Sequence, residues 1–318
     1  MITTGDLFSG LGGTSQGIVQ AGGALRWFAN HNAEACTYHA RNHPNALALV
    51  QDISELHWPT VEPVDWVHAS PACQGDSECG QPARAGTGGN HRPDAAKLAT
   101  RHARMRSTRW AVLAMADALR PRTITVENVP QMYQWQPFGA WCGVLESLGY
   151  VVRRHVLNPR EFGGAQDRPR AIVTARLGEA LDLKVRGNVD AASIESCLLP
   201  DDHPEHRWTE VGSKSDRMRW RVRKAQAEAG SRCFWNNVSE SRGRPLGDVF
   251  PTSTTKSGSQ WNLIDGERMR VIHPRELARS MSFPDHYAIP ANRGLASLLI
   301  GNAMDVALSQ SIAEQVAA

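Results

Sequence analysis

One cysteine stands where a nucleophile could act. Residues 67–74 read Val-His-Ala-Ser-Pro-Ala-Cys-Gln, an apolar run that ends in a turn displaying Cys73. A nucleophilic cysteine needs partial exposure, positive surroundings and no disulfide partner. Residues 84–109 carry seven Lys or Arg and one acid, and this basic segment after the turn fits a covalent enzyme that acts on a polyanion. A buried structural cysteine is the alternative.

Two further runs offer charged side chains beside strand ends. Residues 124–130 are an apolar run that ends on Glu127 and is stopped by a proline. A partly desolvated carboxyl at such a place can exchange a proton with a heterocycle, and a solvated glutamate is the alternative. Residues 163–170 place Arg168 and Arg170 on alternate positions, and therefore on one face of a strand. They could hold a carboxylate or phosphate bidentately, or form a surface ion pair.

A glycine-rich turn could hold a nucleotide-like ligand. Residues 6–13 read Asp-Leu-Phe-Ser-Gly-Leu-Gly-Gly between an expected strand and an expected helix. In an open α/β sheet such ligands bind outside the carboxyl ends of the strands, and glycines let the backbone approach them. The run lacks both phosphate-cradling patterns, GxGxxG and GK[ST]. Its acidic and aromatic residues favour a cationic, adenine-bearing ligand, and a purely structural turn is the alternative.

These residues need a sheet to position them, and the sequence predicts one. Strand-like apolar runs lie at 2–8, 25–30, 46–52, 64–69, 123–127, 150–157 and 170–175, and helical patterns lie at 14–21, 33–42, 108–119 and 139–148. The alternation predicts an α/β fold with a doubly wound, mostly parallel sheet.

After about residue 178 the composition changes. Residues 185–262 are polar and interrupted by Gly, Ser, Pro and Asn, whereas helical patterns return at 274–281 and 295–317. We therefore expect domains at 1–178 and 179–265, the second small and irregular, and a segment 266–318 that returns to the first.

Composition excludes several classes of protein. The 318 residues include no run of 18 apolar residues and no signal-peptide pattern at the N-terminus, so we expect no membrane span and a cytoplasmic protein. The six cysteines contain no CxxC pair and are expected to be free thiols. Cys36, His39 and His43 have ligand-like spacing but no visible fourth ligand, so no metal is expected.

The formal net charge is only +3, so local clusters must carry any binding of nucleic acid. Residues 214–224 contain six basic residues and one acid. Such a run is usually a solvated face. Its place in the polar stretch, with Trp220, Trp235 and Trp261, favours contact with DNA.

In their order along nearly the whole chain, these motifs resemble those of the DNA (cytosine-5) methyltransferases of bacteria and phages. Residues 6–13 are similar to the cofactor motif, 70–74 to the nucleophile motif, 127–129 to the catalytic Glu-Asn-Val, and 166–170 to Gln-x-Arg-x-Arg. Residues 275–279 with 283–284 are similar to the family segment that follows the recognition domain, and residues 300–303 are similar to the final cofactor motif. Residues 185–262 lie where the family has its variable recognition domain, with 250–254 near its end.

The resemblance implies a Rossmann-like fold that uses S-adenosyl-L-methionine, and methyl transfer to C5 of a cytosine flipped out of double-stranded DNA. Cys73 would supply a thiolate to C6, and Glu127 would hold N3 and the amino group of the base. Arg168 would contact the base carbonyl, with Arg170 ordering the site. Gln166 is counted with these catalytic residues.

The resemblance also implies binding residues. Cofactor binding is expected from Phe8, Ser9, Gly10, Leu11, Gly12, His31, Asp52, Ile53, Ala72, Asn302 and Ala303, with Asp52 and Asn302 near the adenine and methionine ends. DNA binding is expected from Arg84, Arg92, Arg101 and Arg104 and from Arg217, Arg219, Arg221 and Arg223. Double-stranded DNA is the expected partner, a cognate restriction endonuclease is a second candidate partner, and a monomer is expected.

The sequence departs from the family pattern at three places. Ala72 stands where the second proline of Pro-Pro-Cys is usual, which alters the turn; Asn30-His31-Asn32 stands where an acid for the cofactor ribose is frequent; and Ala303-Met304 stands where Val-Pro is frequent. An RNA cytosine-5 methyltransferase, a catalytically idle DNA-binding relative and a small-molecule methyltransferase are the alternatives.

Overall fold

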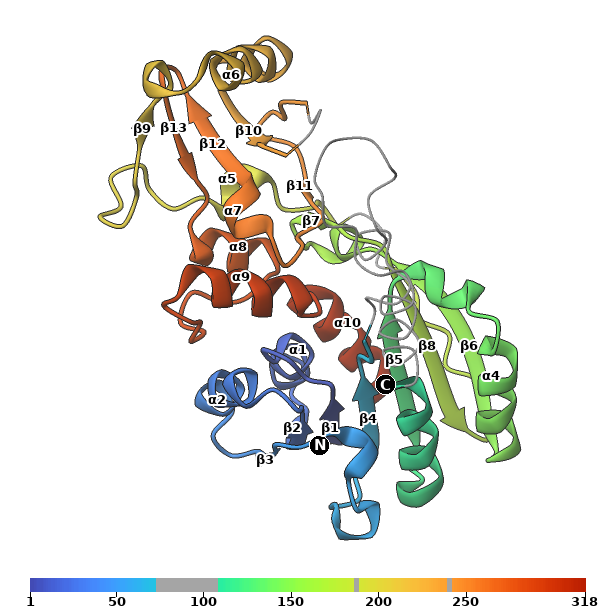
Figure 1. The fold of residues 1–318 in the computed structure, drawn as a ribbon. Coiled ribbons are helices and arrows are strands. Elements are labelled where there is room, and N and C mark those ends of the chain that lie inside the picture. The colour runs from blue at the N-terminus through green and yellow to red at the C-terminus, as the bar shows by residue number, and fades with distance from the viewer. Residues whose placement is uncertain (73–107, 186–188, 239–241) are drawn as a thin grey trace, which may run out of the picture. The chain divides into compact units, whose positions relative to one another are not determined.

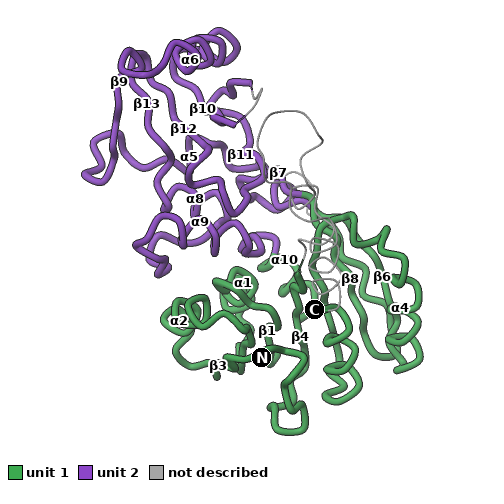
Figure 2. Tube along the Cα trace, in the orientation of Figure 1, with its two compact units in different colours: residues 1–157, 169–185, 309–318 green, residues 158–168, 186–308 purple. Residues whose placement is uncertain are grey.

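The computed structural model describes residues 1–72, 108–185, 189–238 and 242–318. Its contacts define two compact units, coloured separately in Figure 2. Unit 1 comprises Met1–Leu157, Pro169–Val185 and Ser309–Ala318, and unit 2 comprises Asn158–Arg168 and Arg186–Leu308. The domain boundaries at 178 and 265 rest on sequence composition and stay a prediction.

Unit 1 is built on a seven-stranded sheet of order β3-β2-β1-β4-β5-β8-β6 (Figure 1). The strands are β1 (Thr3–Leu7), β2 (Ala24–Ala29), β3 (Leu47–Leu49), β4 (Trp66–Ala69), β5 (Thr123–Asn128), β6 (Tyr150–Leu157) and β8 (Arg170–Leu177). The first five pair in parallel, and only β8 runs antiparallel to its neighbours β5 and β6. The predicted α/β fold with a mostly parallel sheet is confirmed.

The helices of unit 1 also lie where periodicity places them. They are α1 (Gly13–Gln20), α2 (Ala33–Asn42), a helix over 108–119 and α4 (Phe138–Ser147), with short 3₁₀ turns η1 (Ile53–Glu55), η2 (Trp58–Thr60) and η4 (Pro130–Gln134). Helix α2 begins after Asn32, whose side chain accepts a hydrogen bond from the backbone N–H of Ala35. Leu7, Val67, Ile124 and Trp141 are fully buried in the core between sheet and helices.

Close backbone packing ties the C-terminal residues to unit 1. A Cβ on Gly17 of α1 would lie 2.5 Å from the backbone nitrogen of Gln310. Only glycine permits this approach. The side chain of Arg176 on β8 also donates to the carbonyl of Val316 at 2.8 Å. Residues 309–318 are therefore part of the core of unit 1.

Unit 2 is more regular than the polar sequence suggests. Its four-stranded antiparallel sheet has the order β10-β12-β13-β9. The strands are β9 (Thr209–Glu210), β10 (Arg232–Asn236), β12 (Trp261–Asp265) and β13 (Arg268–Val271). They were not predicted because they are only two to five residues long and lie in a stretch that is polar overall. Helix α6 (Asp216–Ala229) packs Val222 and Ala225 on this sheet.

The rest of unit 2 is made of short elements. They are η5 (Pro159–Phe162), β7 (Gln166–Asp167), α5 (Ile194–Cys197), η6 (Val211–Ser213), β11 (Phe250–Pro251), α7 (Ser257–Gln260), α8 (Pro274–Ser280) and α9 (Arg293–Asn302). Strands β7 and β11 pair in parallel. Glu276 of α8 forms a fully buried ion pair with Arg270 of β13, at 2.6 Å. The family-like segment 275–279 thus supplies part of the internal framework of unit 2.

The helix predicted over 295–317 is two helices, α9 and α10 (Val306–Ala317). Asp305 separates them, because its carboxylate accepts hydrogen bonds from the N–H groups of Ala307 and Leu308 at 2.9 and 3.2 Å and so caps α10. By length and composition alone Arg293–Ala317 could cross a membrane, with a mean hydropathy of 1.2. However, 72% of that window is buried inside the protein, as in a core helix.

Candidate active site

The carboxyl edge of the sheet in unit 1 gathers most of the predicted catalytic and cofactor-binding residues. The parallel strands β1 to β5 all end there (Figure 1). The residues that follow these strands are 8–12 after β1, His31 after β2, 52–53 after β3 and Ala72 after β4. Glu127 lies near the end of β5, and Arg170 begins the neighbouring antiparallel β8. Sheet geometry therefore brings together residues that are far apart in sequence.

Glu127 and Arg170 form an ion pair at this edge. The Nε of Arg170 lies 2.8 Å from Oε1 of Glu127, and the two side chains are only 11% and 13% exposed. A charged hydrogen bond with so little solvent is stronger than a surface pair. The carboxylate therefore has a fixed orientation at the end of its strand.

The turn after β4 is held by the neighbouring strands. The backbone N–H of Ser70 donates to the carbonyl of Leu7 at 3.0 Å. The side-chain amide of Asn128 donates to the carbonyl of Pro71 at 2.9 Å, and its oxygen accepts from the N–H of Val129 at 2.9 Å. The sequence predicted no separate role for Asn128 within the Glu-Asn-Val motif, because the spacing of residues along the chain does not reveal its contact with Pro71.

Several predicted residues lie outside the described residues. They are Cys73, which directly follows this turn, and the basic residues Arg84, Arg92, Arg101 and Arg104. Their roles stay predictions.

Of the other five cysteines, the structure describes all except Cys79, which also lies outside the described residues. Cys36, Cys142, Cys197 and Cys233 are buried free thiols. Burial raises the pKa of each, to about 12 for Cys197 and about 11 for Cys233. A buried thiol with a raised pKa supplies little thiolate. None of these four is suited to nucleophilic catalysis.

The turn between β1 and α1 has the backbone of a ligand-binding loop. Phe8, Gly10 and Gly12 have φ values of 59°, 52° and 95°. For a phenylalanine this left-handed conformation is strained, and such strain concentrates at functional sites. The N–H of Ser9 donates to the carbonyl of Ala29 at the end of β2, at 3.2 Å. The loop is thus fastened to the next strand.

Below this loop lies the fully buried carboxyl group of Asp6. It accepts a hydrogen bond from the hydroxyl of Ser15 on α1, at 2.7 Å. Burial raises the pKa of Asp6 to about 7. This contact joins β1 to α1 under the predicted cofactor loop.

Asp52 and His31 complete the predicted cofactor residues of unit 1. Asp52 is exposed and its carboxylate accepts from the N–H and hydroxyl of Ser54, at 3.0 and 2.7 Å, which caps η1. His31 is exposed at the start of the segment that leads into α2. Neither position conflicts with contact to a ligand at the carboxyl edge.

The ligand-like histidines of α2 pack in the core. His39 is fully buried and its ring stacks on Phe28, with centroids 3.7 Å apart. Burial holds the pKa of His39 well below its usual value and lowers that of His43 to about 4. Across the described parts of the chain, no three or more His, Cys, Asp or Glu residues are grouped so that they could hold a metal ion.

Gln166 and Arg168 lie in unit 2, whereas Arg170 lies in unit 1. The buried amide of Gln166 donates to the hydroxyls of Ser253 and Ser280, at 2.6 and 3.0 Å. The guanidinium of Arg168 donates to the carbonyls of Ser253, of Gly301 at 2.9 Å and of Ala303 at 3.4 Å. Arg168 therefore braces the chain on both sides of Asn302.

The arginines of α6 differ in their surroundings. Arg219 pairs with Asp216, Arg223 pairs with Glu267 at 2.6 Å, and the Arg221 guanidinium lies 5.1 Å from the Trp235 ring centroid. Arg217 is exposed, and the described residues offer it no ion-pair partner. Its helical neighbour Trp220 is 65% exposed, with the Lys224 ammonium 5.8 Å from its ring. Arg217, Trp220 and Lys224 form one exposed face.

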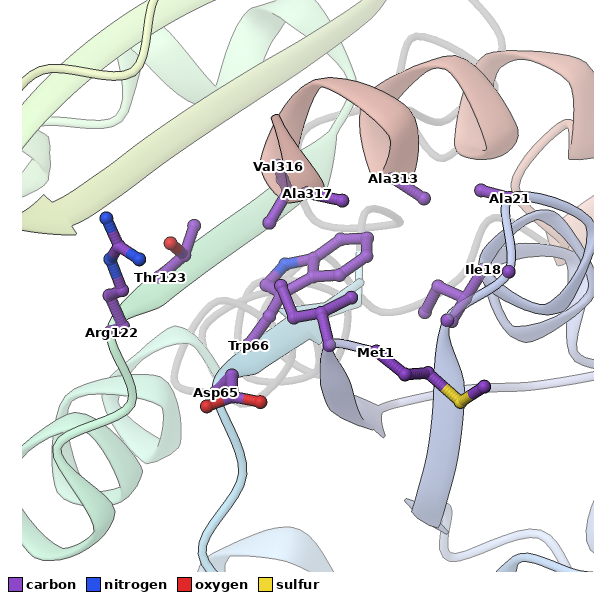
Figure 3. Close-up of a pocket in the computed structure, with 13 residues that line it drawn as sticks. Met1, Ile18, Ala21, Asp65, Trp66, Arg122, Thr123, Ala313, Val316 and Ala317 are labelled. Atoms are coloured by element: carbon purple, nitrogen blue, oxygen red, sulfur yellow. The ribbon is translucent and has the colours of Figure 1, made fainter.

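A pocket of about 380 Å³ lies at the opposite edge of the same sheet, where β1, β4 and β5 begin (Figure 3). Its walls include Trp66 and Thr123 from the strands and Val316 from α10. The carboxylate of Asp65 there accepts from the backbone and the hydroxyl of Thr3, at 2.8 and 2.7 Å. None of the predicted site residues that the structure describes lines this pocket.

Comparison with known proteins agrees with this arrangement. The family model for C-5 cytosine-specific DNA methylases matches residues 2–318. Type II methyltransferase M.NlaX of Neisseria lactamica is 26% identical over 98% of this chain and 95% of its own length. Type II methyltransferase M1.HphI of Haemophilus parahaemolyticus is 26% identical over 98% and 85%.

Solved structures show the same fold. A DNA modification methyltransferase encoded within an E. coli prophage aligns with a TM-score of 0.70 and 20% identity, over 100% of this chain and 99% of its own. The S. pombe Dnmt2 methyltransferase aligns with a TM-score of 0.66 and 18% identity, also over 100% and 99%. Because the family match spans nearly every residue, the chain belongs to the C-5 cytosine-specific DNA methylase family and is a DNA (cytosine-5-)-methyltransferase.

Proposed function

We propose that this methyltransferase acts through a covalent adduct between Cys73 and a cytosine flipped out of double-stranded DNA. The observation that supports this best is the Glu127–Arg170 ion pair at the carboxyl edge, beside the turn that Asn128 holds ahead of Cys73. A carboxylate with a fixed orientation and a braced turn leading to a thiol are what addition to a heterocycle requires.

The chemistry follows from the poor nucleophilicity of cytosine C5. The Cys73 thiolate forms a bond to C6, and the electron pair of the C5–C6 double bond moves into the ring. The negative charge that would develop at N3 is neutralised by a proton that the Glu127 carboxyl group delivers to N3, while its second oxygen accepts a hydrogen bond from the amino group. C5 then carries electron density and would take a methyl group from the bound donor, whose sulfonium sulfur would leave as a neutral thioether. Transfer of the C5 proton to water, return of the N3 proton to Glu127 and elimination of the thiolate restore the aromatic ring and Cys73.

Family membership implies an S-adenosyl-L-methionine-dependent enzyme. The loop 8–12 suits this group, because its glycines have positive φ and leave the backbone open to a ligand beside an aromatic ring. The cofactor supplies an electrophilic methyl group when bound. Phe8, Ser9, Leu11, His31, Asp52 and Ile53 would contact it. Asn302 and Ala303 stay predicted cofactor residues, as the family resemblance implies.

The two arginines of the 166–170 motif take different roles in this proposal. Arg170 orders the site through Glu127, as the sequence predicts. Arg168 was predicted to contact the base carbonyl. Because its guanidinium donates to the carbonyls of Ser253, Gly301 and Ala303, we assign it instead to positioning the segment that carries Asn302. Gln166 supports the same region through Ser253 and Ser280.

Bisulfite sequencing of DNA from cells that express the protein tests the proposed activity. We expect cytosines in one sequence context to resist conversion in cells with the wild-type chain and to be converted in cells with Cys73→Ser. Full conversion in both would contradict it. Type II relatives such as M.NlaX suggest an intracellular role in restriction and modification, with a cognate endonuclease as a partner.

Asp52 gives a prediction about cofactor binding. Asp52→Ala should weaken S-adenosyl-L-methionine binding by roughly 10- to 100-fold, because a hydrogen bond to a charged group contributes about 1.5–3 kcal/mol. Asp52→Asn can still cap η1 but carries no charge, so it distinguishes loss of the charge from loss of the cap. It should weaken cofactor binding too. Glu55→Gln on the same exposed turn is the control and should bind as the wild type does. Calorimetry with wild-type affinity for Asp52→Asn would contradict the placement.

The exposed face of α6 gives a prediction about DNA. Arg217→Ala should weaken binding to every sequence and reduce the slope of log affinity against log salt by about one unit, as loss of one phosphate contact does. Arg223→Ala is a matched control, because Arg223 already pairs with Glu267 at 2.6 Å and should change the slope less. If Arg217, Arg219, Arg221 and Arg223 can all be replaced without effect on affinity or site choice, this helix is a solvated face.

A further inference from the structure

We propose that Thr108 and His68 are positioning residues for methyl transfer, because they hold the turn at residues 70–72 from two sides. This inference rests on the proposed function, in which the turn presents Cys73. Neither residue belongs to the motifs that suggested the family. Both are described by the structure, as are Ser70, Ala72 and Thr125, whose contacts with them carry the argument.

Thr108 holds the last residue of the turn. The backbone N–H of Ala72 donates to its hydroxyl at 3.2 Å. Thr108 lies on the helix over 108–119, and both residues are half-buried. A proline at position 72 has no N–H and could not make this bond. A proline at this position would restrain the turn through its ring. In this chain the hydrogen bond between Ala72 and Thr108 supplies a restraint on the turn instead.

His68 holds the first residue of the turn. Its ring lies on β4 and is fully buried. Nε2 of the ring is 3.0 Å from the hydroxyl of Ser70, and Nδ1 is 2.8 Å from the hydroxyl of Thr125. That hydroxyl also accepts from the indole N–H of Trp66, at 2.9 Å. A chain of hydrogen bonds thus runs from the sheet interior to Ser70.

The protonation state of this chain does not change near neutral pH. Burial lowers the pKa of His68 to about 3, so the ring is neutral. A neutral imidazole donates through one nitrogen and accepts through the other. The hydroxyls of Thr125 and Ser70 can each donate or accept, so either tautomer satisfies both contacts.

The three residues of the turn are therefore held separately. Ser70 is held by His68, Pro71 by Asn128 at 2.9 Å, and Ala72 by Thr108. The restraints come from β4, β5 and the helix over 108–119. A nucleophile must lie within about 0.5 Å of its productive position. Fixing all three residues before Cys73 reduces the reorganisation needed when the thiolate attacks.

Thr108→Val tests the first restraint, because valine keeps the shape and removes the hydroxyl. Single-turnover methyl transfer should fall about three- to tenfold, as expected for one hydrogen bond, with KM for DNA and cofactor unchanged. Thr108→Ser keeps the hydroxyl and should restore the rate. Thr60→Val is the control, since Thr60 is an exposed threonine whose hydroxyl bonds the carbonyl of His57. Equal rates for Thr108→Val and the wild type would overturn the assignment of Thr108.

A double-mutant cycle with Ala72→Pro shows whether Thr108 acts through Ala72. In the Ala72→Pro background the N–H donor is gone, so Thr108→Val should change the rate less than twofold. The same loss in both backgrounds would overturn the inference. Ser70→Ala removes the hydroxyl that His68 contacts and should also lower the rate of methyl transfer. A rate equal to that of the wild type would overturn the assignment of His68.

Hydrogen exchange separates this inference from the proposed function. The Ala72 amide should exchange at least about tenfold faster in Thr108→Val than in the wild type, since an amide that loses its hydrogen-bond partner is less protected. Amides of the central strand β4 should not change. This readout requires no catalysis. If the wild type fails to methylate cytosine, the proposed function fails, whereas an unchanged Ala72 amide overturns the restraint itself.

Discussion

Cys73→Ser should abolish methyl transfer and leave DNA binding intact. Serine is isosteric but is not ionised at neutral pH, so no nucleophile is available for C6 of the base. The rate should fall by roughly 10⁴-fold or more, as for other nucleophile replacements. DNA containing 5-fluorocytosine should trap the wild type as a stable covalent adduct and should not trap the variant. Methylation by Cys73→Ser above trace levels would contradict the assignment.

The buried cysteines are the natural controls. Burial raises the pKa of Cys197 to about 12 and that of Cys233 to about 11, and also raises those of Cys36 and Cys142. Their replacement by alanine removes packing and lowers stability, without removing a thiolate. The methylation rate of the folded variants should stay within about threefold of the wild type, because catalytic losses require groups that act on the transition state. A 5-fluorocytosine adduct should form with each of them.

Much of the fold of unit 1 could be predicted because the buried strands of a parallel sheet appear in the sequence as short apolar runs that alternate with helical patterns. Every strand of unit 1 is an apolar run next to a helical pattern, and all seven runs form strands. Once such a sheet is inferred, its geometry places the segments after β1, β2, β3 and β4 at one edge. This geometry agrees with the grouping of the glycine loop, Asp52, Ala72 and Glu127, which the resemblance to the family implied.

The contacts at that edge could not be predicted in the same way. Thr108 is 36 residues from Ala72 and Asn128 is 57 residues from Pro71, and no local pattern signals such a pair. Arg168 and Arg170 were expected to share a strand face. The strand β8 begins only at Arg170, so the rule of alternate residues does not extend to Arg168. Its partners come instead from segments more than 80 residues away.

Glu127→Gln should lower the rate of methyl transfer by about 10²- to 10³-fold, the loss typical when one charge-stabilising group is removed from an active site. Glutamine keeps the size of the side chain and loses both the charge and the capacity to hold a proton for N3. KM for DNA should change little, because docking depends mainly on phosphate contacts. A variant within a few fold of the wild-type rate would contradict a role for this carboxylate.

Replacement of Arg170 tests whether the Glu127 carboxylate must also be oriented for methyl transfer. Arg170→Met should reduce the rate, since it leaves Glu127 without the guanidinium that lies 2.8 Å from it. If Arg170 acts only through Glu127, the double variant should be no slower than Glu127→Gln, and the effects should not add. A slower double variant would mean that Arg170 contacts the base itself. Glu179→Gln is the matched control, because Glu179 pairs with Arg122 at 3.1 Å in the same unit but is 55% exposed. Exposed pairs contribute about 0–1 kcal/mol, so this variant should keep the wild-type rate while Arg170→Met does not.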